Sequence, residues 1–197
     1  MKNDQIRNTI IDSVKNNQPP LLPMPSIPHF GADDTNDLIE AFSQGVARMA
    51  GTVILDAVPD LDDFVRSRFP NSKIICSAVP ECQGTLQPKE LAHWSDANTI
   101  DVSIVRSPLG VAETGSILLS DKELQINTIA FLSHDLVILL EPNNIVRNIH
   151  DAYQHPYFKS RPYNVLMTGP SGSGDIGGVT VHPAQGVKTL TVVLTAT

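Results

Sequence analysis

The chain has 197 residues, of which 41% are hydrophobic and 18% are charged, so it is long enough and apolar enough to bury one core of ordinary size. Aromatic residues make up only 5% of it, and a core of Ile, Val, Leu and Ala suits buried parallel strands. The formal net charge is −7, and no stripe of Lys and Arg runs along the sequence. We therefore expect no nucleic acid among its partners.

Membrane insertion and secretion are also not expected. No stretch approaches the roughly 18 consecutive apolar residues that a transmembrane helix needs, and the longest apolar run, residues 136–140, has the length of a buried strand. Residues 1–14 are polar and amphipathic, unlike a signal peptide. The prediction is a cytoplasmic protein with no membrane partner.

The residues that usually hold metals are few and unfavourably spaced. Cys76 and Cys82 are the only cysteines, their C-x5-C spacing matches no common zinc or disulfide pattern, and an iron–sulfur cluster usually takes four. The six histidines include no H-E-x-x-H pair. We expect two free thiols, with Cys76 inside a strand, and neither a metal nor a cofactor.

The N-terminal 30 residues differ from the rest. Ile6, Ile10 and Val14 recur at helical spacing and predict a short amphipathic helix, which is marginal unless it docks on another surface. Prolines then predict an extended arm that carries this helix across the domain or onto a neighbouring subunit of a homo-oligomer. The expected division is residues 1–30 and residues 31–197. The prolines are Pro19, Pro20, Pro23, Pro25 and Pro28.

Helices and strands alternate over the next fifty residues. Apolar stripes predict helices over residues 38–49 and 61–69, and β-rich runs predict strands over residues 52–55 and 73–79. This alternation is typical of a parallel sheet with helices packed on it. The residues expected to bound the helices are Thr35 or Asn36 as N-cap, Gly51 as the closing residue of the first, and Pro70 as the stop of the second.

The second half is richer in strands. The sequence predicts one helix there, over residues 143–153, with Pro142 near its start and Ile145 and Ile149 on its inner face. In the strand over residues 99–105, Ile100, Val102 and Ile104 are expected on one side. The fold class is therefore α/β, with a parallel-rich mixed sheet and flanking helices. The other predicted strands are residues 116–119, 136–140, 163–168, 179–181 and 188–195.

The segment 107–116 is the first that could carry chemistry. Its glycines permit tight turns, and Glu113 stands between two apolar strands, where a carboxylate could act as general base or nucleophile. The alternative is a structural role, in which Glu113 caps local backbone amides or pairs with a nearby basic residue.

The segment 168–178 is the second, because its glycines and serines leave many backbone N–H groups free to bind an anion. Gly169 and Gly174 have the spacing of a P-loop, but Asp175 stands where that motif needs Lys. The fingerprint Gly172-x-Gly174-x-x-Gly177 is followed by strand residues rather than a helix, which argues against dinucleotide binding. The alternative is a flexible surface loop.

We predict that the two segments meet in space beyond the carboxyl ends of the strands and form one site for a small anionic ligand. Glu113 is the predicted catalytic residue. The predicted ligand-binding residues are Thr114, Gly115, Ser116, Gly169, Pro170, Ser171, Gly174 and Asp175.

Taken together, the two segments resemble the LUD (lactate utilisation) family, in particular its lactate-utilisation protein C branch. The core Ala112-Glu-Thr-Gly-Ser116 matches one family motif, and Gly169-Pro-Ser-Gly-Ser-Gly-Asp-Ile176 matches a second, in the right order and near the C-terminus. The likeness covers roughly residues 33–197. Gly177 stands where the family usually has Glu, and Gln185 where it usually has His, so any chemistry of those two side chains is in doubt here.

The resemblance implies a fold similar to the sugar-phosphate isomerase and CoA-transferase group. It also implies a place in a system that oxidises L-lactate to pyruvate together with iron–sulfur subunits. A chain without cluster cysteines would be a non-redox accessory subunit that binds a small anion. The alternatives are a stand-alone isomerase or CoA-transferase-like enzyme that uses Glu113, and a protein-interaction subunit without a ligand.

Overall fold

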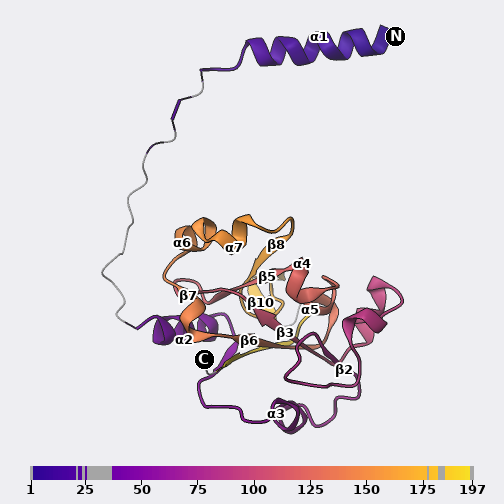
Figure 1. Ribbon diagram of the computed structural model, residues 1–197, viewed down its shortest axis with the longest axis vertical. Coiled ribbons are helices and arrows are strands. Elements are labelled where there is room, and N and C mark those ends of the chain that lie inside the picture. Colours follow the sequence, from indigo (N-terminus) through magenta and orange to yellow (C-terminus); the bar gives the residue numbers. More distant parts are fainter. Residues whose placement is uncertain are drawn as a thin grey trace. The chain divides into compact units, whose positions relative to one another are not determined.

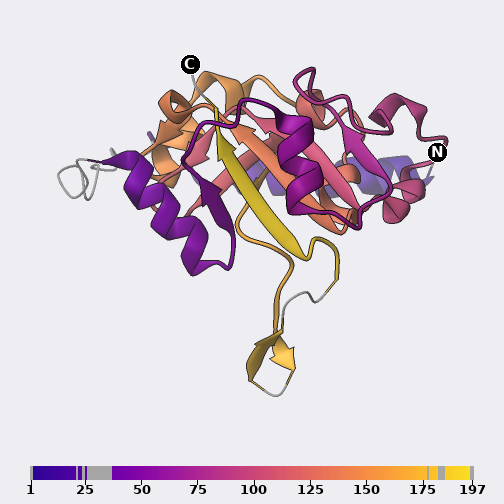
Figure 2. The ribbon, with the colours of Figure 1, turned by 90° about the horizontal axis from the view of Figure 1, so that it is seen from below.

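A computed structural model of the chain is shown in Figures 1 and 2. The structure describes residues 2–20, 22–23, 25, 37–176, 178–181 and 185–195. The chain divides into two compact units, Met1–Asp34 and Thr35–Thr197, and each is described by itself.

The first unit contains helix α1 (Lys2–Asn16), which confirms the predicted N-terminal helix. Its apolar residues Ile6, Ile10 and Val14 are between 55% and 59% exposed. The prolines from Pro19 to Pro25 belong to neither a helix nor a strand, and Pro28 lies outside the described residues.

A five-stranded parallel sheet forms the centre of the second unit, as the alternating pattern predicts. Its order is β1-β11-β6-β3-β2, and every neighbouring pair is parallel. All five strands therefore end at the same edge of the sheet. Their bounds are β1 (Thr52–Ile54), β2 (Ile75–Ser77), β3 (Val102–Ser107), β6 (Asp135–Leu140) and β11 (Thr189–Leu194).

Both faces of this sheet are buried, which explains why residues 136–140 of β6 form a continuous apolar run. Leu136, Ile138 and Leu140 join one core cluster, and the alternating residues Val137 and Leu139 join a second. Helix α2 (Leu38–Arg48) contributes to the first cluster and helix α3 (Leu61–Arg68) to the second.

The strand prediction for residues 99–105 is partly wrong. Val102 and Ile104 share one face as expected, but Ile100 precedes the strand and packs in the opposite cluster. The reason is a 3-10 helix, η2 (Trp94–Thr99), which ends at Ile100 with the Ile100 N–H bonded to the Ala97 carbonyl.

A second, four-stranded sheet has the order β7-β4-β5-β8 and mixes parallel and antiparallel pairs. The fold class is thus confirmed as α/β and parallel-rich, with most of the strands shared between these two sheets. The bounds are β4 (Gly110–Val111), β5 (Ser116–Ser120), β7 (Ile145–Val146) and β8 (Asn164–Met167).

The predicted helix over residues 143–153 is wrong in its first half. Residues Pro142–Asn144 form a 3-10 turn, η3, and Ile145 and Val146 pair with β4 as strand β7. The helix, α6 (Ile149–Gln154), begins only after Asn148, whose side chain accepts a hydrogen bond from the Asp151 N–H.

The ends of α2 also differ from expectation. Asp37 caps the helix, since its Oδ1 accepts the N–H groups of Ile39 and Glu40 at 2.9 and 3.0 Å, whereas Thr35 and Asn36 lie outside the described residues. At the other end the left-handed residue is Ala50, with φ 62°, rather than Gly51.

The remaining elements are short. The predicted strand over residues 179–181 is confirmed and forms an antiparallel hairpin with β9, which projects away from the two sheets in Figure 2. The bounds are η1 (Pro88–Glu90), α4 (Asp121–Leu124), α5 (Ile129–Leu132), α7 (Pro156–Lys159), β9 (Ser173–Ile176) and β10 (Val179–Val181).

Both cysteines are free and buried, with Cys76 inside β2 as predicted. Burial raises the pKa of the Cys76 thiol to about 12 and that of Cys82 to about 11. Within the described ranges, no three His, Cys, Asp or Glu side chains are grouped so that they could hold a metal ion. No helix in the described part of the chain is long and apolar enough to span a membrane.

Two turns lie directly on α2, main chain against main chain. Gly115, with φ 68°, is so close that an added Cβ would stand 2.2 Å from the Val46 nitrogen. Gly169, with φ 69°, is equally close to the end of the helix, because an added Cβ would stand 2.2 Å from the Met49 carbonyl oxygen. Gly45 faces Gly115 from the helix, and its own Cβ would meet the Gly115 nitrogen at 2.6 Å. These three glycines are needed for backbone packing.

We expect Gly115→Ala to lower the free energy of unfolding by about 3 kcal/mol or more, because the new methyl group has no space and the backbone is left-handed. Gly174→Ala is the matched control, since no atom lies within 4 Å of its added Cβ. It should cost less than about 1 kcal/mol in urea unfolding. Equal stability of the two variants would contradict the close packing on α2.

The carboxylate of Asp101 fixes the main chain just before β2, because it accepts hydrogen bonds from the N–H groups of Ile74 and Lys73 at 2.9 and 2.7 Å. These bonds lower its pKa below the ordinary 3.8. A carboxyl with a lowered pKa stabilises the fold above its ordinary pKa, and this contribution disappears as the pH falls. Asp101→Asn should therefore be less stable than the wild type at pH 7, by a margin that shrinks below about pH 4. A margin that is independent of pH, or one shared by the exposed control Asp12→Asn, would rule this out.

We expect removal of residues 1–30 to lower the melting temperature or change the elution volume, because the apolar face of α1 needs a surface to cover it. The fall should be about 2–4 °C for each kcal/mol of docking free energy that is lost. Replacing Ile6, Ile10 and Val14 together by Ser in the full chain should have the same effect and leaves the arm intact. If both proteins melt and elute like the wild type, α1 does not dock.

Candidate functional site

The two glycine-bearing segments meet, as the sequence analysis predicts. Strands β5 and β8 are antiparallel neighbours with Ile117 opposite Met167, so the turn before β5 adjoins the loop after β8. The Ser116 and Thr168 hydroxyls share a hydrogen bond of 2.5 Å, and the Thr114 hydroxyl continues the chain to Ser116 at 2.7 Å. Thr168, the first residue of the second segment but not one of the predicted ligand-binding residues, links the two segments.

The predicted position at the carboxyl ends of the parallel strands is wrong for the second segment. The Ser171 N–H donates to the Val187 carbonyl at 2.9 Å, and Val187 comes just before β11. Gly169 lies against Met49, which comes just before β1. The loop therefore lies at the amino ends of β1 and β11, because the last turn of α2 and the approach to β11 hold it there.

Arg48 places a positive charge where the two glycine-bearing segments meet. It lies in the last turn of α2, and its Nη2 donates to the main-chain carbonyl of Glu113 at 3.3 Å. With Thr168 it lines a hollow of about 590 Å³. Among the side chains that the structure describes, Arg48 is the only charged one lining this hollow, whose other members are Met49, Pro170, Gly172, Ser173 and Gly174.

Arg48 was missed because its signal in the sequence is weak. A basic residue in the last turn of a helix is common, since it favours the negative end of the helix dipole. Arg48 and Glu113 are 65 residues apart, and only the fold brings them together.

Glu113 has a structural partner. Its carboxylate oxygen Oε2 accepts the N–H of Ile149, the first residue of α6, at 3.2 Å. Its own N–H donates to the Arg147 carbonyl at 2.9 Å. The residue is exposed rather than enclosed between strands. This geometry agrees with the amide-capping alternative, and the catalytic role of Glu113 stays a prediction.

The other predicted ligand residues occupy different positions. Pro170 and Gly174 line the hollow beside Arg48, and Gly115 is packed against α2. Ser116 is only 3% exposed, so its hydroxyl orients Thr168 through their hydrogen bond and has little surface of its own for a ligand. Asp175 lies in β9, and its side chain is outside the described residues.

A smaller hollow of about 270 Å³ adjoins the first, with Thr168 and Pro170 common to both. Gly169, Ser171 and Gln185 also line it. The Ser171 hydroxyl donates to the Gln185 carbonyl and accepts the Gln185 N–H, so the main chain of Gln185 closes this loop. Gly177, the other departure from the family motif, lies outside the described residues.

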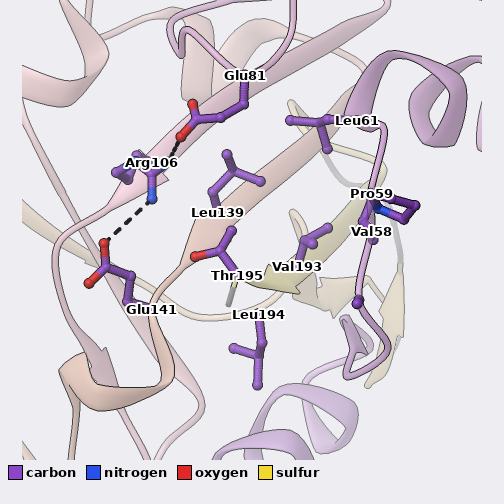
Figure 3. A pocket seen from close by; sticks show the side chains of 11 residues that line it. Val58, Pro59, Leu61, Glu81, Arg106, Leu139, Glu141, Val193, Leu194 and Thr195 are labelled. Carbon is purple, nitrogen blue, oxygen red and sulfur yellow. Dashed lines mark hydrogen bonds and ion pairs between the residues drawn. The ribbon is translucent and has the colours of Figure 1, made fainter. Parts of the chain in front are cut away.

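A separate pocket of about 600 Å³ opens at the carboxyl edge of the parallel sheet and was not predicted. Arg106 forms ion pairs there with Glu81 and, at 3.9 Å, with Glu141 (Figure 3). The segments after β1, β2, β6 and β11 bring its lining residues together, including Pro59 and Thr195. Sequence reasoning missed it because these residues are isolated in the chain and belong to no motif.

Comparisons with known proteins agree with this architecture. The family model described as the LUD domain matches residues 87–195. Among solved structures, the chain is similar to the crystal structure of a DUF162 family protein from Deinococcus radiodurans, with a TM-score of 0.60 and 13% sequence identity. That superposition covers 81% of this chain and 96% of the other, and at such low identity it shows the fold alone. No curated protein matches the chain. Because the family match spans more than half of the sequence and includes both glycine-bearing segments, the chain belongs to the LUD domain family.

Proposed function

We propose that the chain binds a small organic anion beside Arg48, as a non-redox component of an L-lactate utilisation system. The LUD domain family is associated with lactate utilisation in general, which favours L-lactate or pyruvate as the anion. The observation that carries the proposal is the guanidinium of Arg48 in a hollow lined by a hydroxyl and a glycine-rich loop.

The chemistry of the hollow suits a carboxylate. A guanidinium offers several N–H donors in one plane and binds carboxylates through paired hydrogen bonds. One donor of Arg48 is held by the Glu113 carbonyl, which fixes the side chain at the hollow. The Thr168 hydroxyl is hydrogen-bonded to Ser116, which is hydrogen-bonded to Thr114. Thr168 therefore offers a second donor or acceptor in the same hollow as Arg48. Gly172, Ser173 and Gly174 line the same hollow, and their small side chains let a ligand approach the main chain.

The non-redox part of the proposal rests on the cysteines. The whole sequence has two, and an iron–sulfur cluster usually takes four. Electron transfer would then belong to partner subunits, and this chain would hold or present the substrate or product.

A stand-alone isomerase or CoA-transferase-like enzyme is the second candidate. It is favoured by the position of Glu113, whose main chain is bound by Arg48 next to the hollow. Glu113→Gln separates the two roles. A general base would lose turnover with the fold intact, whereas an amide cap would lose stability.

We expect isothermal titration with L-lactate, pyruvate and inorganic phosphate to show binding of at least one of them to the wild-type chain. Arg48→Gln should weaken that binding about tenfold or more, since a charge-assisted pair is lost. Arg68→Gln is the matched control, because Arg68 lies in the last turn of α3, away from the hollow.

Unchanged affinity in Arg48→Gln would place the anion elsewhere. If no anion binds to the wild type but an iron–sulfur partner co-purifies, the third alternative holds, a protein-interaction subunit without a ligand.

A further inference from the structure

The pocket at the carboxyl edge of the parallel sheet has the features of a second binding site. Its volume of about 600 Å³ falls in the range of pockets that hold small molecules. Among the residues that the structure describes, none lines both this pocket and either of the two hollows near Arg48. In open sheets with parallel strands, ligands commonly bind at this edge.

The charges of this pocket oppose an anion. Of the described side chains that line it, three are charged, namely Glu81, Arg106 and Glu141. Nη2 of Arg106 is paired closely with Glu81, which neutralises the guanidinium. Glu141 is 3.9 Å from Nη1, at the outer limit of an ion pair, and its side chain is 44% exposed. One carboxylate is thus in excess and only loosely held, which favours a cation.

Thr195 provides a second polar group beside Glu141. The Thr195 N–H donates to the Leu140 carbonyl at 3.0 Å, so Thr195 lies next to the residue that precedes Glu141. Its hydroxyl oxygen is buried, and no group in the described part of the chain forms a hydrogen bond with it. Figure 3 shows this side chain among the lining residues, between Glu141 and Val193. A buried hydroxyl without a partner is unfavourable. Rotation about the Cα–Cβ bond of Thr195 would turn this hydroxyl towards the pocket, where a ligand donor would remove that cost.

The rest of the lining is apolar. Leu61, Leu139 and Val193 are each at most 7% exposed, and Val58 and Pro59 form the wall after β1 (Figure 3). Such a surface binds hydrocarbon rather than a second polar group.

We propose that this pocket binds a primary aliphatic ammonium ion. The ammonium group donates hydrogen bonds to the Glu141 carboxylate and, after rotation of the Thr195 side chain, to its hydroxyl, and the hydrocarbon rests chiefly on Val58 and Pro59, the more exposed part of the apolar lining. The site differs from the one beside Arg48 in place and in the sign of the charge that it selects. Failure of amine binding at this site would therefore leave the proposed anion binding beside Arg48 untouched, and the reverse also holds.

Three probes of similar shape test the proposal by isothermal titration: 3-methylbutylamine as the cation, 3-methylbutan-1-ol as the neutral analogue and 4-methylpentanoate as the anion. The amine should bind at least about tenfold more tightly than either of the others. Glu141→Gln should weaken binding of the amine by about tenfold, and Thr195→Val should weaken it severalfold. Glu40→Gln on α2 and Arg48→Gln are the controls, and both should bind the amine like the wild type.

Methyl resonances of Leu139 and Val193 in the wild-type protein locate the probe without any variant, and they should shift with the amine. A free amine and a lysine side chain of another protein share this chemistry. Tighter binding of N-acetyl-lysine methylamide than of 3-methylbutylamine would assign the site to a lysine side chain, and the reverse to a free amine. Stronger binding of 4-methylpentanoate, amine affinity that Glu141→Gln leaves unchanged, or no amine binding at millimolar concentration would overturn the proposal.

Discussion

The contact of α2 with the turn before β5 is the constraint on which the candidate anion site depends. Gly45 and Gly115 bring the two main chains so close that neither position has room for a Cβ. Because no side chain separates them, the last turn of α2 has little freedom to move. Arg48 can then reach the Glu113 carbonyl, and Met49 meets Gly169 of the second segment. This one backbone contact therefore fixes three groups relative to one another. They are the Arg48 guanidinium, the hydrogen-bonded hydroxyls of Thr114, Ser116 and Thr168, and the glycine-rich loop.

Burial patterns were enough to predict most of the sheet and its helices. The run 136–140 is apolar on both faces because β6 lies inside a two-sided sheet. The same reasoning failed at Ile145, whose spacing to Ile149 fits a helix. Pairing of Ile145 with Gly110 outweighs that local preference, and such pairing between distant segments is not visible in a local pattern.

The candidate site was predictable only in part. Motif spacing identified the two segments that meet at Ser116 and Thr168, but it attributed the glycines to tight turns in the first segment and to the ligand in the second. The structure shows that Gly115 and Gly169 make room for α2. Arg48, Arg106 and Thr195 carry no local signature, because their significance arises from strand order and from the end of a helix. The fold also determines the charge of each site. The hollow beside Arg48 contains a guanidinium, and the pocket at the carboxyl edge of the parallel sheet contains one carboxylate in excess.

The most direct test of anion binding beside Arg48 is a titration of isotope-labelled protein with L-lactate and pyruvate, followed through the backbone amides and the arginine Nε resonances. We expect the chemical shifts to change at Arg48 Nε and in the amides of residues 168–174, while that of Arg106 Nε stays constant. Changes confined to the carboxyl edge of the parallel sheet, or no change with either anion, would contradict this expectation.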